Sequence, residues 1–196
     1  MYFSTPGWDL GLFRTVNNDL RSPILDVAMP LISSPIFLWG LAIILLLRHL
    51  QLGNKTALTV LLGMGICIGI SDMGCSFLKD ATGRLRPVNQ LAGVHYREDG
   101  EWRVRPANFQ SEKWKGKSFP SAHAANAMAA ACFLALLIKR RRHLVWLLPG
   151  LVGYSRIYLG KHFPSDVLAG WTFGAAVAGI ALVLLSPALK GRAPGP

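Results

Sequence analysis

The chain has 196 residues, of which 52% are hydrophobic and 16% are charged, and its mean hydropathy is +0.36. Soluble domains carry about 25% charged residues, so this composition excludes an ordinary cytosolic enzyme, a disordered chain and a collagen-like fibre. The net charge of +11 would suit a nucleic-acid binder, but the apolar residues fall in runs long enough to cross a bilayer. We therefore expect the lipid bilayer, and no nucleic acid, as a partner. The length predicts one domain over residues 1–196.

Residues 1–21 have the pattern of a short amphipathic helix. The apolar residues of this stretch share one helical face and Asp9 lies elsewhere; they are Trp8, Leu12, Phe13, Val16 and Leu20. Such a pattern is typical of a helix that lies in the membrane surface.

Five apolar segments follow within residues 25–185. A bilayer core about 30 Å thick requires roughly 20 helical residues, and we expect spans over residues 25–50, 55–78, 120–138, 143–160 and 164–185. Pro30 and Pro35 should kink the first span. The predicted fold class is all-α: a polytopic membrane helix bundle of five transmembrane helices plus an N-terminal amphipathic interfacial helix.

The distribution of charge predicts the orientation. Residues 48–55, 139–142 and 190–192 hold eight basic residues and no acid, so the positive-inside rule places these segments in the cytoplasm. Five crossings then place the N-terminus, the loop 83–119 and the turn around residues 161–163 on the outer side. The loop carries eight basic and four acidic residues, and we expect its middle, residues 95–117, to be solvated and irregular.

Three polar clusters lie at the predicted outer ends of different spans. They are Lys79 with Arg86-Pro87, then Pro120-Ser121-Ala122-His123, and finally Ser155-Arg156 with His162 and Asp166. Charge and chemistry are independent features of the sequence, and the predicted topology brings all three clusters to the same side of the membrane. This agreement predicts a single site.

The residue types in these clusters suit phosphoryl transfer. Lys79, Arg86 and Arg156 would bind an anion, and guanidinium groups match phosphate oxygens through paired hydrogen bonds. One histidine can attack phosphorus while the other protonates the departing oxygen. Asp166 follows His162 by four residues and can hold one ring nitrogen. The histidines and Asp166 could in principle bind zinc, but the surrounding cations would repel it, so we expect neither a metal nor a cofactor.

These residues resemble the type-2 phosphatidic acid phosphatases, also called lipid phosphate phosphatases. The family pattern has three parts, K-x6-R-P, P-S-G-H and S-R-x5-H-x3-D. Residues 79–87 match the first part and residues 155–166 the third in type and spacing. The second part departs at Ala122, where the family usually has Gly. The resemblance covers residues 25–185.

The resemblance implies a role for each matching residue. His162 would be the nucleophile that forms a phosphohistidine, Asp166 would orient it, and His123 would be the general acid. The phosphoryl oxygens would be bound by Lys79, Arg86, Ser121 and Arg156. The family needs no divalent cation, which agrees with a site poor in carboxylates.

The resemblance also implies a substrate and a location. The small size and five-span layout are similar to bacterial members that dephosphorylate undecaprenyl diphosphate, so we expect a bacterial inner-membrane protein whose site faces the periplasm or exterior. Phosphatidylglycerol phosphate, phosphatidic acid and lipid A phosphates are alternative substrates. A lipid phosphotransferase and a non-catalytic lipid-binding protein are alternative functions.

Three further features carry expectations. Asp72, seven residues before Lys79, either pairs with a polar group or water near the outer mouth or positions Lys79. Trp102 and Trp114 in the outer loop would contact the lipid surface. Close helix packing is expected at a glycine cluster in the second span, namely Gly63, Gly65 and Gly69.

Overall fold

The computed structural model describes residues 5–34, 36, 40, 43–44, 47–48, 51, 55–111, 116–138 and 142–190. Its elements in chain order are α1 (Gly7–Arg14), a π-helical turn η1 (Thr15–Asp19), α2 (Pro23–Ile32), α4 (Lys55–Thr82), α5 (Pro87–Gln90), β1 (His95–Glu98), β2 (Glu101–Val104), α6 (Ala122–Leu137), a 3₁₀ turn η2 (Arg142–Trp146), α7 (Leu147–Tyr158) and α8 (Pro164–Lys190). The described chain is mostly helical, as predicted.

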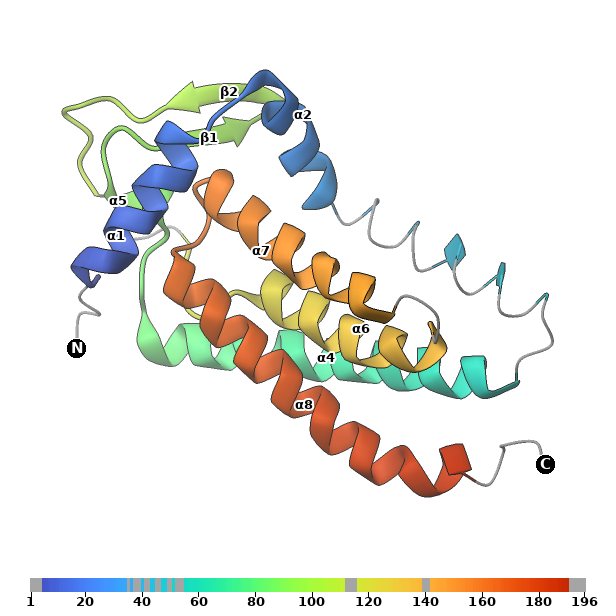
Figure 1. Ribbon diagram of the computed structural model, residues 1–196. Coiled ribbons are helices and arrows are strands. Elements are labelled where there is room, and N and C mark those ends of the chain that lie inside the picture. The colour runs from blue at the N-terminus through green and yellow to red at the C-terminus, as the bar shows by residue number, and fades with distance from the viewer. Residues whose placement is uncertain are drawn as a thin grey trace.

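Helices α4, α6, α7 and α8 form a bundle, and α1, α5 and the β1–β2 hairpin gather at one end of it (Figure 1). Helix α6 packs against α4, α7 and α8. Two of its alanines, Ala129 and Ala131, are fully buried beside Phe133 and the α8 residue Ala178. Small side chains let the helix axes approach closely, which is how helices associate where lipid surrounds them.

Within the part of the chain that the structure describes, two helices are long and apolar enough to cross a membrane, over Ala57–Thr82 and Pro164–Pro187. They correspond to the second and fifth predicted spans. Helix α6 has 16 residues and α7 has 12, which is shorter than a bilayer core requires for a straight helix. Beyond α2, most of the first predicted span lies outside the described residues. Five crossings therefore remain a prediction.

The expectation of an all-α fold with an irregular outer loop is wrong for part of residues 83–119. Strands β1 and β2 pair antiparallel, with His95 opposite Val104. The turn residues Asp99 and Gly100 both have positive φ, 51° and 86°, as the Asp-Gly type I′ hairpin turn requires. The two-residue turn and the alternating side chains on each side are a local signal for this hairpin.

The N-terminal helix has its polar side inward. Asp9 and Asn17 are 0% exposed, whereas Trp8 and Leu12 are about half exposed and Phe13 is buried. Asn17 is held by the amide N–H of His95 and donates to two backbone carbonyls. The apolar residues predicted to share one face therefore point in different directions, some into the protein and some away from it. The polar residues can be buried because their hydrogen-bonding groups have partners inside the protein.

The hairpin is attached through Trp102 to α2 and to Tyr158 of α7, whose ring centroid lies 5.8 Å from that of the indole. The Trp102 indole N–H donates to the Asp26 carbonyl oxygen at 3.2 Å, and the Arg21 guanidinium lies 4.1 Å from the indole centroid. Trp102 thus packs on the protein and is half-buried, and its expected contact with the lipid surface stays a prediction. Trp114 lies outside the described residues. Asp72 is exposed on α4 and interacts electrostatically with Lys79.

Candidate active site

The structure brings the three polar clusters to the end of the bundle where α1, α5 and the hairpin lie (Figure 1). Helices α4 and α7 end there, and α6 and α8 begin there. The Ser121 amide N–H donates to the Asp166 carbonyl at 2.9 Å, which joins the start of α6 to the start of α8. The hydroxyl of Thr82 donates to the Phe119 carbonyl at 3.0 Å. Segments far apart in sequence therefore meet through main-chain contacts.

Local sequence signals set the ends of these helices. Gly83 follows α4 with φ of 63°, and its N–H donates to the Lys79 carbonyl, a common glycine-based helix ending. At the start of α6, the Ser121 hydroxyl accepts the Ala124 N–H at 3.4 Å, as an N-cap residue does. Ser121 is fully buried, so its hydroxyl caps the helix that presents His123.

Two glycines of α8 fix how closely α8 approaches α6. A Cβ atom at Gly170 would overlap the Ser121 carbonyl, and one at Gly174 would overlap the Ala125 carbonyl. In the predicted cluster of α4, only Gly63 makes such a close approach, whereas Gly65 and Gly69 face open space. The close contact that positions the site is therefore between α6 and α8.

His162 lies in the turn between α7 and α8 and is 2% exposed. Its Nδ1 is 3.6 Å from Asp166 Oδ2, slightly longer than a hydrogen bond, and such catalytic contacts often tighten when substrate binds. Asp166 Oδ2 also accepts the Phe163 N–H at 2.8 Å. Burial lowers the pKa of His162 to about 4, although Asp166 opposes the shift. The ring is therefore neutral near pH 7, with Nε2 available as a nucleophile.

Three cations lie near one another at this end of the bundle. Lys79 is repelled by Arg86 and Arg156, and both arginines act electrostatically on His162. In the described part of the chain, Lys79, Arg86 and Arg156 form no ion pair with a carboxylate, and the Nε atoms of both arginines are buried without a hydrogen-bond partner. Burial lowers the pKa of the Arg86 guanidinium. Unpaired buried donors of this kind suit an anion.

His123 faces the same cluster from the first turn of α6. It interacts electrostatically with Arg156, His162, Lys79 and Arg86 and is half-buried. All seven residues singled out in the sequence are thus at one end of the bundle. Lys161 adds a fourth cation nearby, and its pKa is lowered by burial and by Arg86 and Arg156.

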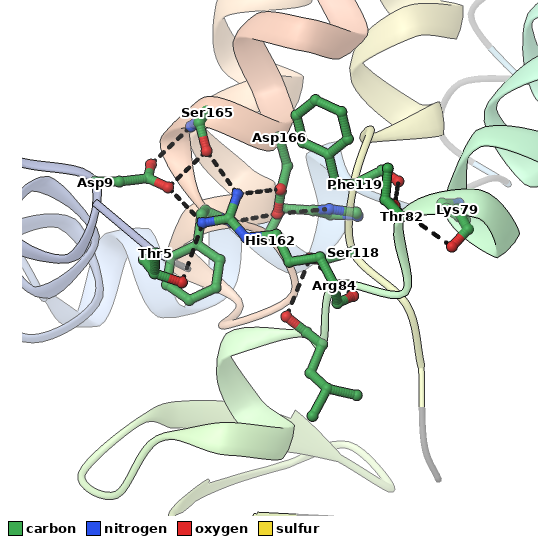
Figure 2. A network of polar contacts seen from close by, with 12 residues as sticks. Thr5, Asp9, Lys79, Thr82, Arg84, Ser118, Phe119, His162, Ser165 and Asp166 are labelled. Atoms are coloured by element: carbon green, nitrogen blue, oxygen red, sulfur yellow. Dashed lines mark hydrogen bonds and ion pairs between the residues drawn. The ribbon is translucent and has the colours of Figure 1, made fainter. Parts of the chain in front are cut away.

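Three contacting residues escape prediction from the sequence. Arg84 and Asp9 form a buried network with Asp166 (Figure 2), and Ser33, at the end of α2, accepts a hydrogen bond from Arg156. Arg84 lies inside the first motif, and a basic residue two positions before Arg86 could have indicated a role in the site. No local pattern singles out Asp9 or Ser33. Among the described residues, no group of three or more His, Cys, Asp or Glu side chains could hold a metal ion.

Comparison with known proteins identifies the family. The family model of the PAP2 superfamily matches residues 56–189, which include all three motifs. The chain belongs to the PAP2 superfamily. A lipid A 4'-phosphatase of Bacteroides thetaiotaomicron is 31% identical over 170 residues, 80% of this chain and 68% of that protein. An undecaprenyl-diphosphatase of Sulfolobus acidocaldarius is 26% identical over 88% of this chain and 76% of that protein.

The fold agrees with that of a solved structure. The crystal structure of Aquifex aeolicus LpxE matches with a TM-score of 0.69 and 27% identity, over 93% of this chain and 99% of that one. This PAP2 protein is therefore a membrane protein and an enzyme of the lipid phosphatase class. Membership of this class decides against the non-catalytic lipid-binding alternative.

Proposed function

We propose that this protein removes a phosphate or diphosphate group from a membrane lipid without a metal ion, through a phosphohistidine on His162. The observation that carries the proposal is the convergence of Lys79, Arg86 and Arg156 beside a buried neutral imidazole. Mutually repelling cations are stabilised by an anion, and a phosphoryl group supplies both the charge and the acceptor oxygens.

The reaction proceeds in two displacements. Nε2 of His162 attacks phosphorus while Asp166 holds the Nδ1–H, so an N–P bond forms and the P–O bond to the lipid breaks. His123 donates its proton to the departing oxygen. Water then attacks the phosphohistidine and returns a proton to His123; the N–P bond breaks and inorganic phosphate leaves. Each step follows the usual logic of covalent and acid–base catalysis.

The phosphoryl oxygens are bound by Lys79, Arg86 and Arg156. Their charge stabilises the transition state, which is the main source of rate in phosphoryl transfer. Ser121 contributes through the hydroxyl that caps α6, and this hydroxyl retains its own proton for donation to a phosphoryl oxygen. Hydrolysis of phosphate monoesters is among the slowest uncatalysed reactions, with enzymatic accelerations of up to about 10²¹.

We place the protein in a bacterial inner membrane, with five crossings and the site facing the periplasm or exterior. The support is the run of four basic residues at positions 139–142, compared with the single basic residue Lys161 in the turn between α7 and α8. The outward side chains of α1, Trp8 and Leu12, suit contact with the lipid interface near the site.

Two lipids are candidate substrates. Lipid A phosphate is the stronger, because the relative named lipid A 4'-phosphatase has 31% identity over most of the chain. Undecaprenyl diphosphate is supported by a relative of that name at 26% identity. Both present a phosphoryl group at the membrane surface, where the cations converge.

The test is phosphate release by the purified full-length protein in detergent micelles, with EDTA present. The panel contains lipid A, undecaprenyl diphosphate, phosphatidylglycerol phosphate and phosphatidic acid. We expect one lipid to dominate and His162→Ala to abolish release, while His143→Ala, a change at an exposed histidine, leaves it unchanged. Full activity of His162→Ala would contradict the proposal. Adding lipid alcohols as acceptors separates hydrolysis from phosphotransfer, since a phosphotransferase would form a newly phosphorylated lipid.

A further inference from the structure

Arg84, which has no role in the proposed reaction, lies at the centre of a buried polar network (Figure 2). Its Nη1 donates to Asp166 Oδ1 at 2.6 Å, and its Nη2 donates to Asp9 Oδ2 at 2.5 Å. The exposed fraction of the Arg84 side chain is 1%, and that of each carboxylate is 0%. Charges removed from water to this extent persist only when they are paired with good geometry.

The Arg84 contact completes the bonding of the Asp166 carboxylate. Oδ1 accepts from Arg84, whereas Oδ2 accepts the Phe163 N–H and faces Nδ1 of His162. With a strong donor on each oxygen, rotation of the carboxylate about its Cβ–Cγ bond would break both hydrogen bonds. These contacts therefore hold Oδ2 toward His162.

Arg84 is itself held on three sides. Asp9 of α1 binds the other guanidinium nitrogen and also accepts the N–H and hydroxyl of Ser165. The Phe163 ring lies 4.2 Å from the guanidinium carbon. A planar guanidinium fits two carboxylates and a ring face at once, and a lysine ammonium does not.

We propose that Arg84 is a positioning residue of the reaction: anchored by Asp9, it fixes the Asp166 carboxylate and through it the orientation of the His162 ring. This inference rests on the proposed roles of His162 and Asp166. It also gives α1 a part in catalysis, because the N-terminal helix supplies the anchor from outside the residues that the family model matches.

The experiment measures kcat and KM with the lipid of the panel that the wild-type protein turns over fastest. Arg84→Gln and Arg84→Lys should each lower kcat by roughly 10- to 100-fold with KM within about threefold, because a small misplacement of a catalytic group has effects of this size. Arg84→Lys retains the positive charge and loses the planar guanidinium that binds two carboxylates at once. A low kcat in this variant therefore shows that positioning, and not charge alone, is required. Arg103→Gln, which breaks the exposed pair with Glu98, is the matched control and should behave as wild type.

Loss of Arg84 leaves two buried carboxylates unpaired, so the Asp9→Asn/Arg84→Gln double variant is prepared as well. It carries one buried charge fewer, and its fold is checked by melting temperature and size-exclusion profile. A folded double variant with wild-type kcat would overturn the inference.

The second readout is the dependence on Asp166. If Arg84 acts through Asp166, Arg84→Gln lowers the residual kcat of Asp166→Asn by less than about twofold, as expected for residues that act as one unit. An equal loss in both backgrounds would show that Arg84 acts independently and would overturn the inference. His162→Ala is measured in parallel. If it retains activity, the proposed nucleophile is wrong; if it is inactive and Arg84→Gln matches wild type, only the present inference fails.

Discussion

The amide N–H of Ser121 donates to the main-chain carbonyl of Asp166 at 2.9 Å. This hydrogen bond links the residue before α6 to the first turn of α8. It therefore helps to set the distance between His123, on α6, and His162, just before α8. Gly170 lies on the same contact, where its missing Cβ leaves room for the Ser121 carbonyl. The relative placement of His123 and His162 therefore depends on main-chain packing and on a glycine four residues beyond Asp166.

Gly170→Ala should destabilise the protein and lower its activity together. The added methyl group would overlap the Ser121 carbonyl, and overpacking of this kind costs about 1–3 kcal/mol. The measurement is the melting temperature in detergent alongside kcat. Gly179→Ala lies on the same helix with nothing within 4 Å of the added atom, so it should change neither quantity. Equal melting temperatures for the two variants would contradict the packing argument.

Arg156→Ala should lower kcat by roughly 10²- to 10³-fold, by analogy with removal of one oxyanion donor. Ser33 accepts a hydrogen bond from Arg156 Nη1, so Ser33→Ala should release the guanidinium and lower kcat about 10-fold, which corresponds to about 1.4 kcal/mol. Ser186→Ala, at a half-buried serine near the far end of α8, is the control. Turnover equal to wild type in Arg156→Ala would remove this residue from the site.

The pH dependence of kcat/KM should be bell-shaped, because His162 must be neutral while His123 is protonated. Burial lowers the pKa of His162 to about 4, so one limb of the profile should lie near that pH. A flat profile from pH 3 to 8 would contradict the assignment of the two histidines.

The same depressed pKa predicts how stability changes with pH. His162 stays neutral in the folded protein down to about pH 4, whereas in the unfolded chain it takes up a proton near its ordinary value of 6.5. The unfolded state therefore binds more protons between these values, and folding stability falls as the pH is lowered from 6.5 to 4. Melting curves of wild type and His162→Asn over this window should diverge, with the smaller loss in the variant.

The sequence alone determined the helical class, the phosphoryl-transfer chemistry and the residues of the candidate site. Apolar runs reveal helices because helix formation follows a local period. The motif spacings name Lys79, Arg86, His123, Arg156, His162 and Asp166 because their chemistry is visible in residue type. Even the β1–β2 hairpin, which we did not predict, had a local signal in Asp99-Gly100.

The tertiary structure alone decided which side chains hold the site in place. Asp9 and Arg84 are 75 positions apart in sequence, and Ser33 and Arg156 are 123 apart. No periodicity connects residues at such separations, because their contact depends on how whole helices pack. For the same reason, the inward direction of Asp9 on α1 became visible only once α1 was placed against α8. A charged residue is buried where a partner of opposite charge pairs with it, and here that partner comes from elsewhere in the chain.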